Sequence, residues 1–353
     1  MSTTHTAGLE GVIAVETSIA EPDRDGGALR YRGVDITDLV GEVRYEQVWG
    51  LLVDDDPGPC LAPVDVPRVP HTGEPMADLQ ATLASLSGRW GLRKLVDMDT
   101  AEVRADLERL SSAAFVAAAA LAAGHDASID VHGTLAERFV AAWRGTAIRE
   151  VVEAIETYWI CTAEHGLNAS TFAARVVAST GADAGACLSA AVGALSGPLH
   201  GGAPARVVPM LDEAEACCDA DRAVGAILAR GERLMGFGHR VYRAEDPRAR
   251  LLRETARRIG APRYALALEV ERAALAELAR RKPDRVLATN VEYWSAVVLD
   301  AAGVPPHFAP VLFACSRTAG WSAHILEQHA TGRLIRPAAR YIGSPPRPLA
   351  AVA

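Results

Sequence analysis

The strongest constraint on the fold is a helical spacing of apolar residues that recurs from about residue 100 to residue 330. The segment 101–123 starts with a polar face and continues as an almost unbroken apolar run. In the segment 146–161, Val151, Ile155 and Tyr158 fall on one side of a helix. Further helices are expected at 168–180, 182–195, 206–218, 220–230, 246–259, 262–281, 291–301 and 309–329. The sequence therefore predicts a mainly α-helical protein.

The first hundred residues have a less regular pattern. Short strands are expected at 11–17 and 28–31, and a helix is expected at 36–52. The segment 54–75 is rich in proline and aspartate, which favours an exposed loop.

Composition excludes several classes of protein. With 353 residues the chain can bury a sizeable core without disulfides or metals. A net charge of −8 disfavours a nucleic-acid-binding protein and a polybasic membrane anchor. No stretch reaches the roughly 18 consecutive apolar residues of a membrane span, and the N-terminus does not resemble a secretory signal. The six cysteines form no Cys-x-x-Cys pair. We therefore expect a cytoplasmic protein with reduced thiols and no bound metal.

Five segments interrupt the helical background with His, Arg or an acid, mostly beside Gly or Pro. They are Ala-Glu-His-Gly-Leu-Asn-Ala-Ser at 163–170, Ser-Gly-Pro-Leu-His-Gly-Gly-Ala-Pro at 196–204, Met-Gly-Phe-Gly-His-Arg-Val-Tyr-Arg-Ala-Glu-Asp-Pro-Arg-Ala at 235–249, Thr-Asn-Val-Glu-Tyr-Trp-Ser at 289–295 and Cys-Ser-Arg-Thr-Ala-Gly-Trp at 315–321. Glycines around a histidine let the backbone approach a ligand closely. The start of a following helix offers free N–H groups to an anion. Taken singly, each segment is a weak signal, because a lone histidine in a glycine-rich turn is more often structural than catalytic and a single arginine is usually a solvated charge.

Together and in this order, the segments resemble the active-site signatures of the citrate synthase family. The resemblance extends from about Gly8 to Tyr341. It implies a helical fold with a large domain, a smaller domain and the active site in the cleft between them. The corresponding boundaries are 1–205 and 313–353 for the large domain and 206–312 for the small domain.

The resemblance also implies a reaction, in which acetyl-CoA condenses with oxaloacetate and citryl-CoA is hydrolysed to citrate and CoA. Glu292 matches the general base that removes a proton from the thioester methyl group. His200 matches the donor to the thioester oxygen, and His239 matches the donor to the ketone of oxaloacetate. Separate acid and base groups of this kind are the general solution to such proton transfers.

Substrate-binding residues follow from the same resemblance. Planar guanidinium groups bind carboxylates in a bidentate manner, as oxaloacetate requires. The residues that match the oxaloacetate site are His165, Arg248, Arg317 and Arg336. Those that match the CoA site are Arg243, Gly201, Gly202 and Gly236. Arg336 is expected to act in trans within a homodimer, with acetyl-CoA as a co-substrate and no permanently bound cofactor.

One departure from the family pattern concerns the general base, because this chain has Glu292 where aspartate is usual. The extra methylene displaces the carboxylate by about an ångström, and such a misplacement can cost about 10²-fold in rate. Two alternatives to citrate synthase therefore stay open. The chain could be a 2-methylcitrate synthase that uses propionyl-CoA, or a non-catalytic paralogue that binds CoA and a dicarboxylate. Glu164 also replaces a common aspartate, and His324 is expected to face the core or a dimer partner.

Overall fold

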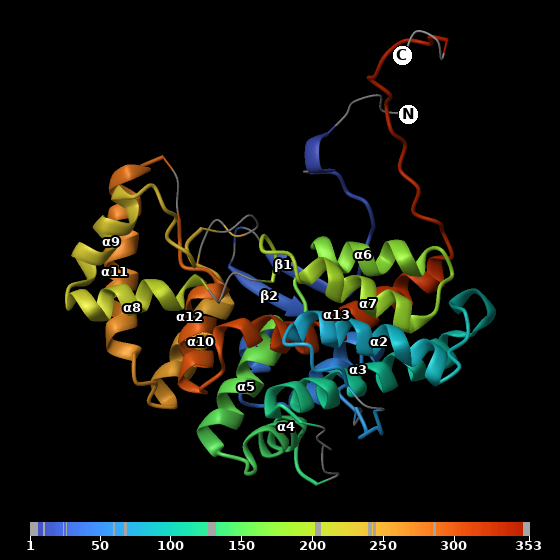
Figure 1. Ribbon diagram of the computed structural model, residues 1–353, viewed down its shortest axis with the longest axis horizontal. Coiled ribbons are helices and arrows are strands. Elements are labelled where there is room, and N and C mark those ends of the chain that lie inside the picture. The colour runs from blue at the N-terminus through green and yellow to red at the C-terminus, as the bar shows by residue number, and fades with distance from the viewer. Residues whose placement is uncertain are drawn as a thin grey trace.

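The computed structural model describes residues 6–9, 11–23, 25, 27–58, 61–66, 69–125, 132–201, 206–238, 242, 245–284 and 287–348. These residues form thirteen α-helices, a few short 3₁₀ turns and one small antiparallel sheet (Figure 1). The prediction of a mainly α-helical fold is confirmed.

The sheet lies near the N-terminus and has the order β1-β2-β3, formed by Ala20–Asp23, Ala28–Tyr31 and Val34–Asp35. The prediction of a strand at 28–31 is confirmed, whereas residues 11–17 are irregular. The predicted helix at 36–52 is wrong in its first half. Only a 3₁₀ turn forms there, and the carboxylate of Asp35 caps it by accepting hydrogen bonds from both the N–H and the hydroxyl of Thr37. Gly41 then turns the chain at a φ of +88°.

The helices follow the expected segments to within a few residues at most ends. Their bounds are α1 Tyr45–Asp54, α2 Pro75–Arg89, α3 Thr100–Ala123, α4 Leu135–Arg144, α5 Arg149–Thr162, α6 Ala169–Ala178, α7 Ala184–Leu195, α8 Val208–Cys217, α9 Ala220–Ala229, α10 Pro247–Arg258, α11 Tyr264–Arg281, α12 Val291–Ala301 and α13 Ala309–Thr331. Helices α2 and α4 were not among the predicted helices, although Leu79, Leu83 and Leu86 bury one face of α2 at helical spacing.

Helix α13 runs through the centre of the molecule and contacts α1, α3, α5, α6 and α7. Most of its residues are buried on every side, which is typical of a central helix. Three aromatic rings, Tyr45, Phe115 and Trp159, pack together beside it, with centroids 4.8 to 5.7 Å apart. This core fixes the elements that carry the site.

Helices α8, α9 and α11 form a group at one end of the molecule (Figure 1). Helices α10 and α12 pack against each other and against α5, so they connect this group to the central core. The domain boundaries at 205/206 and 312/313 remain a prediction.

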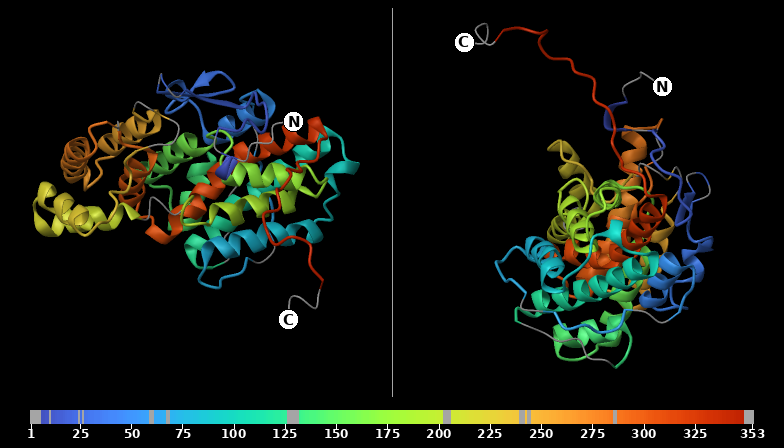
Figure 2. Two further views of the ribbon diagram at one scale, coloured as in Figure 1. Left: turned by 90° about the horizontal axis from the view of Figure 1, so that it is seen from above. Right: turned by 90° about the vertical axis from the view of Figure 1, so that its right-hand side faces the viewer.

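The two ends of the chain leave the body on the same side (Figures 1 and 2). Residues 332–348 have no helix or strand and are almost entirely exposed. A hydrogen bond of 3.1 Å from the N–H of Ile335 to the hydroxyl of Ser179 attaches the start of this tail to α6.

Candidate active site

The expected site residues come from elements that converge on α5 and α13. His165 lies in the turn between α5 and α6, and His200 lies in the turn after α7. Arg248 and Glu292 stand in the first turns of α10 and α12, the two helices that pack on α5. Arg317 projects from the middle of α13. Five segments that are far apart in sequence are thus brought together.

His200 is held by a tight turn and by a serine on α6. Its N–H donates to the carbonyl of Gly197, and the N–H of Gly201 donates to the carbonyl of Leu195. A Cβ at Gly201 would lie 2.5 Å from that Leu195 oxygen, so the turn requires glycine. The ring Nε2 of His200 is 2.8 Å from the hydroxyl oxygen of Ser170.

The Ser170 hydroxyl occupies the centre of a small hydrogen-bond network. It accepts from the indole N–H of Trp321 at 3.2 Å, donates to Asn168 Oδ1 at 2.8 Å and lies 2.8 Å from His200 Nε2. Asn168 Oδ1 also accepts two backbone N–H groups that cap α6. This network holds the imidazole of His200 in place through its Nε2.

Burial, reinforced by the charge of Arg317, lowers the pKa of His200 to about 4. The imidazole is therefore neutral at pH 7. A neutral ring can donate one hydrogen bond without adding a positive charge to the site.

Glu292 sits at the start of α12, which is joined to a glycine-rich loop. Asn290 caps the helix by accepting from the N–H of Glu292, and its amide donates to the carbonyl of Gly238 at 2.8 Å. The N–H of Asn290 donates to the carbonyl of Gly236 at 2.9 Å. Gly236 has a φ of +88°, and a Cβ there would lie 2.7 Å from Cβ of Tyr293. Glycine at position 236 thus allows its loop to pack closely against Tyr293 in the first turn of α12.

The pKa of Glu292 is raised to about 7, mainly by burial; the negative charge of Asp246 adds to the rise and Arg248 opposes it. No described residue donates a hydrogen bond to its side chain. A carboxylate with this pKa is suited to take up a proton near neutral pH.

Arg248 and Asp246 form a buried bidentate ion pair with N···O distances of 2.9 and 2.8 Å. Asp246 also caps α10 and accepts the N–H of Val291 at 3.0 Å, so it ties the start of α10 to the start of α12. Asp246 was not expected as a site residue. Its position two residues before Arg248, in an Asp-Pro-Arg sequence, is the signal that predicts such a cap.

Arg317 is 2% exposed, and its Nε donates to the carbonyl of Thr162 at 2.8 Å. Its guanidinium lies over the ring of Phe313. Among the described residues, its two terminal nitrogens have no hydrogen-bond partner. Burial lowers the pKa of Arg317, and the charge of Glu164 opposes this effect. A buried guanidinium with free terminal N–H groups is suited to bind a carboxylate.

His165 contacts a tyrosine that the sequence analysis did not single out. Its Nε2 is 3.0 Å from the hydroxyl oxygen of Tyr242, and the two rings meet edge to face. Tyr242 lies six residues before Arg248, in the segment that precedes α10. Its contact with His165 therefore connects that segment to the turn after α5.

The remaining expected residues do not join this cluster within the described chain. His239, Arg243 and Gly202 lie outside the described residues. Arg336 is exposed on the C-terminal tail. The expectation that it serves the site of a partner subunit remains a prediction.

A cavity of about 360 Å³ lies next to the Gly236 loop. Met210, Ile227 and Met235 provide apolar walls. Two arginines, Arg206 and Arg233, and two glutamates, Glu213 and Glu232, provide the charged part of its lining.

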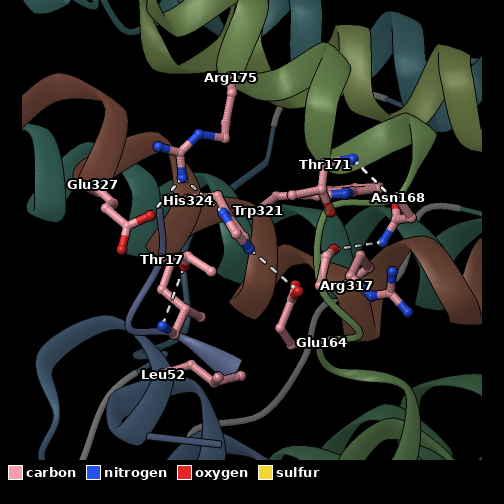
Figure 3. A network of polar contacts seen from close by, with 12 residues as sticks. Thr17, Leu52, Glu164, Asn168, Thr171, Arg175, Arg317, Trp321, His324 and Glu327 are labelled. Carbon is pink, nitrogen blue, oxygen red and sulfur yellow. Dashed lines mark hydrogen bonds and ion pairs between the residues drawn. The ribbon is translucent and has the colours of Figure 1, made fainter. Parts of the chain in front are cut away.

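A chain of buried polar contacts runs behind the site (Figure 3). Glu327 pairs with Arg175 at 2.6 Å, Arg175 contacts His324 Nδ1 at 2.9 Å, and His324 Nε2 contacts Glu164 at 3.2 Å. His324 faces the core, which was the first of the two positions expected for it. The role of Glu164 in this chain was missed, because nothing near it in sequence indicates a partner 160 residues away.

Neither a bilayer-spanning helix nor a group of metal-binding side chains occurs in the described part of the chain. The five cysteines in that part are free thiols.

Comparison with known proteins gives a consistent result. The family model "Citrate synthase, C-terminal domain" matches residues 8–58 and 62–338. A Mycobacterium tuberculosis protein named "Putative citrate synthase 2" is 56% identical over 348 residues, covering 96% of this chain and 93% of its own. The citrate synthase of Haloferax volcanii is 34% identical over 366 residues, covering 95% of each chain. The structure is similar to the citrate synthase of Thermoplasma acidophilum, solved with carboxymethyl coenzyme A and oxaloacetate, with a TM-score of 0.84, 26% identity and 98% of both chains covered.

Proposed function

This chain belongs to the citrate synthase family of acyl-transferring enzymes, and on that premise we propose that it condenses acetyl-CoA with oxaloacetate and hydrolyses citryl-CoA to citrate and CoA. The observation that carries the proposal is the pairing of a neutral imidazole with a carboxylate titrating near pH 7. His200 and Glu292 form this pair, beside the buried guanidinium of Arg317.

The chemistry requires an acid and a base with separate roles. The carboxylate of Glu292 takes a proton from the thioester methyl group, and the developing enolate oxygen accepts a hydrogen bond from the neutral imidazole of His200. The enolate carbon then attacks the ketone carbon of oxaloacetate, whose oxygen becomes a hydroxyl with a proton from His239. Water finally cleaves the thioester, which releases citrate and the thiol of CoA.

Oxaloacetate binding requires cationic and hydrogen-bond donors for two carboxylates. Oxaloacetate has two carboxylates, for which Arg248, Arg317 and His165 supply donors from one chain. We propose that Arg336 of a partner subunit completes this set, so that the enzyme is active in the cytoplasm as a homodimer. The long exposed tail that carries Arg336 supports this arrangement, because it can reach beyond its own chain.

Coenzyme A is proposed to bind along the glycine-rich turns at Gly201, Gly202 and Gly236, with Arg243 on its phosphates. The cavity beside Gly236 supports this position. Its apolar walls suit the adenine, and the phosphate groups are proposed to lie outside it near Arg243, because two glutamates offset the charge of the two arginines in its lining.

The test of this function is release of free thiol from acetyl-CoA and from propionyl-CoA in the presence of oxaloacetate. A higher kcat/KM with acetyl-CoA supports the proposal. A higher value with propionyl-CoA would instead identify a 2-methylcitrate synthase. Stabilisation against heat by oxaloacetate without any thiol release would identify a binding protein that has lost catalysis.

A further inference from the structure

Tyr158 lies at the junction of the helices that carry the site, although no role has been assigned to it. It stands on α5 one turn before Thr162, whose hydroxyl donates to the Tyr158 carbonyl at 2.7 Å. The carbonyl of Thr162 in turn accepts from Nε of Arg317. The hydroxyl of Thr162 lies 2.7 Å from that of Ser316, the neighbour of Arg317 on α13. Residues four apart share a helix face, so Tyr158 projects from the face of α5 that meets α13. The same helix packs against α10, α12 and α13, which carry Arg248, Glu292 and Arg317.

The hydroxyl of Tyr158 differs from those of other buried tyrosines in this chain. Tyr31 bonds to the carbonyl of Ile160, Tyr45 to that of Ser316 and Tyr293 to that of Ala267, at distances of 2.6 to 3.0 Å. Tyr158 is only 1% exposed, yet no described residue forms a hydrogen bond with its hydroxyl. The hydroxyl oxygen is not among the fully enclosed unpaired atoms of the described residues, so the small exposed part of Tyr158 includes this oxygen, which borders space that water or a ligand can occupy.

Burial keeps the Tyr158 hydroxyl protonated, and the charged side chains around it determine which ligand group it can bind. Burial raises the pKa of Tyr158 well above its usual value, while Arg317, Glu292 and Arg248 all act on it electrostatically. The phenol is therefore a neutral donor close to Arg317, whose terminal nitrogens are also free donors among the described residues. A carboxylate is the group that accepts hydrogen bonds from a guanidinium and a phenol together.

We propose that Tyr158 is a substrate-binding residue whose hydroxyl donates a hydrogen bond to the carboxylate of the dicarboxylate substrate that Arg317 binds. This inference rests on the proposed function. It adds a neutral donor to the arginines and histidines that the family resemblance supplies. It also gives a role to a hydroxyl that no described residue pairs, at a position where a phenylalanine would fill nearly the same space.

The test compares Tyr158→Phe with Tyr264→Phe, a control that removes the hydroxyl of a partly buried tyrosine on α11. Initial rates are measured against oxaloacetate and against acyl-CoA, and unfolding temperatures are measured with and without oxaloacetate. For Tyr158→Phe we expect the KM for oxaloacetate to rise about tenfold, as the loss of one hydrogen bond to a charged group implies. The stabilisation by oxaloacetate should fall in parallel. The KM for acyl-CoA and the pH profile should stay unchanged, and the unliganded protein should be at least as heat-stable as the wild type.

Three results with this variant would overturn the inference. An oxaloacetate KM within twofold of the wild type would show that the hydroxyl does not touch the substrate. A lower kcat with a shifted pH profile and unchanged oxaloacetate binding would show that it acts through Glu292. A lower unfolding temperature without ligand would show that the protein itself pairs the hydroxyl. Failure of the proposed function is seen separately, because the wild type would then neither bind oxaloacetate nor release CoA.

Discussion

His324 Nε2 lies 3.2 Å from Glu164 Oε1 in the interior, where both side chains are completely buried (Figure 3). Arg175 contacts the opposite ring nitrogen, Nδ1, at 2.9 Å. Because a guanidinium only donates hydrogen bonds, Nδ1 must accept, and the ring proton therefore lies on Nε2 and points at Glu164. Glu164 is the neighbour of His165, so the network supports a segment that carries a substrate-binding residue.

Replacing His324 by leucine should destabilise the protein by about 3 kcal/mol, because Arg175 and Glu164 would lose the group that links them. The measurement is the free energy of unfolding in urea. His307→Leu is the matched control, since His307 is exposed and its loss should change that free energy by less than about 0.5 kcal/mol. Equal effects of the two substitutions would contradict a supporting role for the network.

Gly320 allows Glu164 to lie directly against α13. A Cβ at this position would lie 1.9 Å from Glu164 Oε2 and 2.8 Å from the carbonyl of Ala163. Gly320→Ala should therefore cost about 1–3 kcal/mol of stability and raise the KM for oxaloacetate, because the segment next to His165 must move. Gly225→Ala, in α9 where the added methyl group meets no atom within 4 Å, should be neutral or stabilising. Urea unfolding and initial rates measure both effects.

Ser170 should be needed for the orientation of His200. Ser170→Ala removes the hydroxyl that lies 2.8 Å from His200 Nε2, so we expect kcat to fall by about 10²-fold. Stability should fall by about 1–3 kcal/mol, because the buried indole N–H of Trp321 loses the same partner. Ser196→Ala removes an exposed hydroxyl at the other end of the same turn and serves as the control. A kcat within threefold of the wild type for Ser170→Ala would contradict the assigned hydrogen bond.

The pH profile should report Glu292 as the base. With a pKa of about 7 for Glu292 in the free enzyme, kcat/KM should rise as pH increases from 6 to 8 and then level off. Glu292→Gln should abolish thiol release at every pH. Glu292→Asp should keep a rising limb but lower the rate by about 10²-fold, because the carboxylate is withdrawn by one methylene. A full rate for Glu292→Gln would exclude this residue as the base.

The same pKa predicts how stability changes with pH. The pKa of Glu292 is raised in the folded state, so the folded protein binds its proton more tightly than the unfolded chain does. The favourable contribution of this group is present at low pH and is lost as pH rises through about 7. Glu292→Gln should therefore raise the unfolding temperature at pH 8 and change it little at pH 4. An equal shift at both pH values would show that ionisation is not the cause.

Much of the helical framework could be predicted from the sequence, because apolar spacing and local caps act over a few residues. Asp99 and Asp183, for example, cap α3 and α7 close to the expected starts. The errors lie where a local contact overrides the apolar pattern. The turn at Gly41, whose φ is +88°, separates the short 3₁₀ turn at 36 from α1, and the proline-rich approach to α2 concealed a helix that follows it.

The sequence by itself determined the fold class, the helices and the short segments in which the chemistry is concentrated, since these depend on neighbouring residues. Only the tertiary structure decided that Glu164 faces His324 and that Tyr158 faces the site, because each relationship joins helices distant in sequence. It also decided the chemical state of the site residues. The neutral imidazole of His200 and the raised pKa of Glu292 come mainly from burial, and burial is created by packing distant elements together.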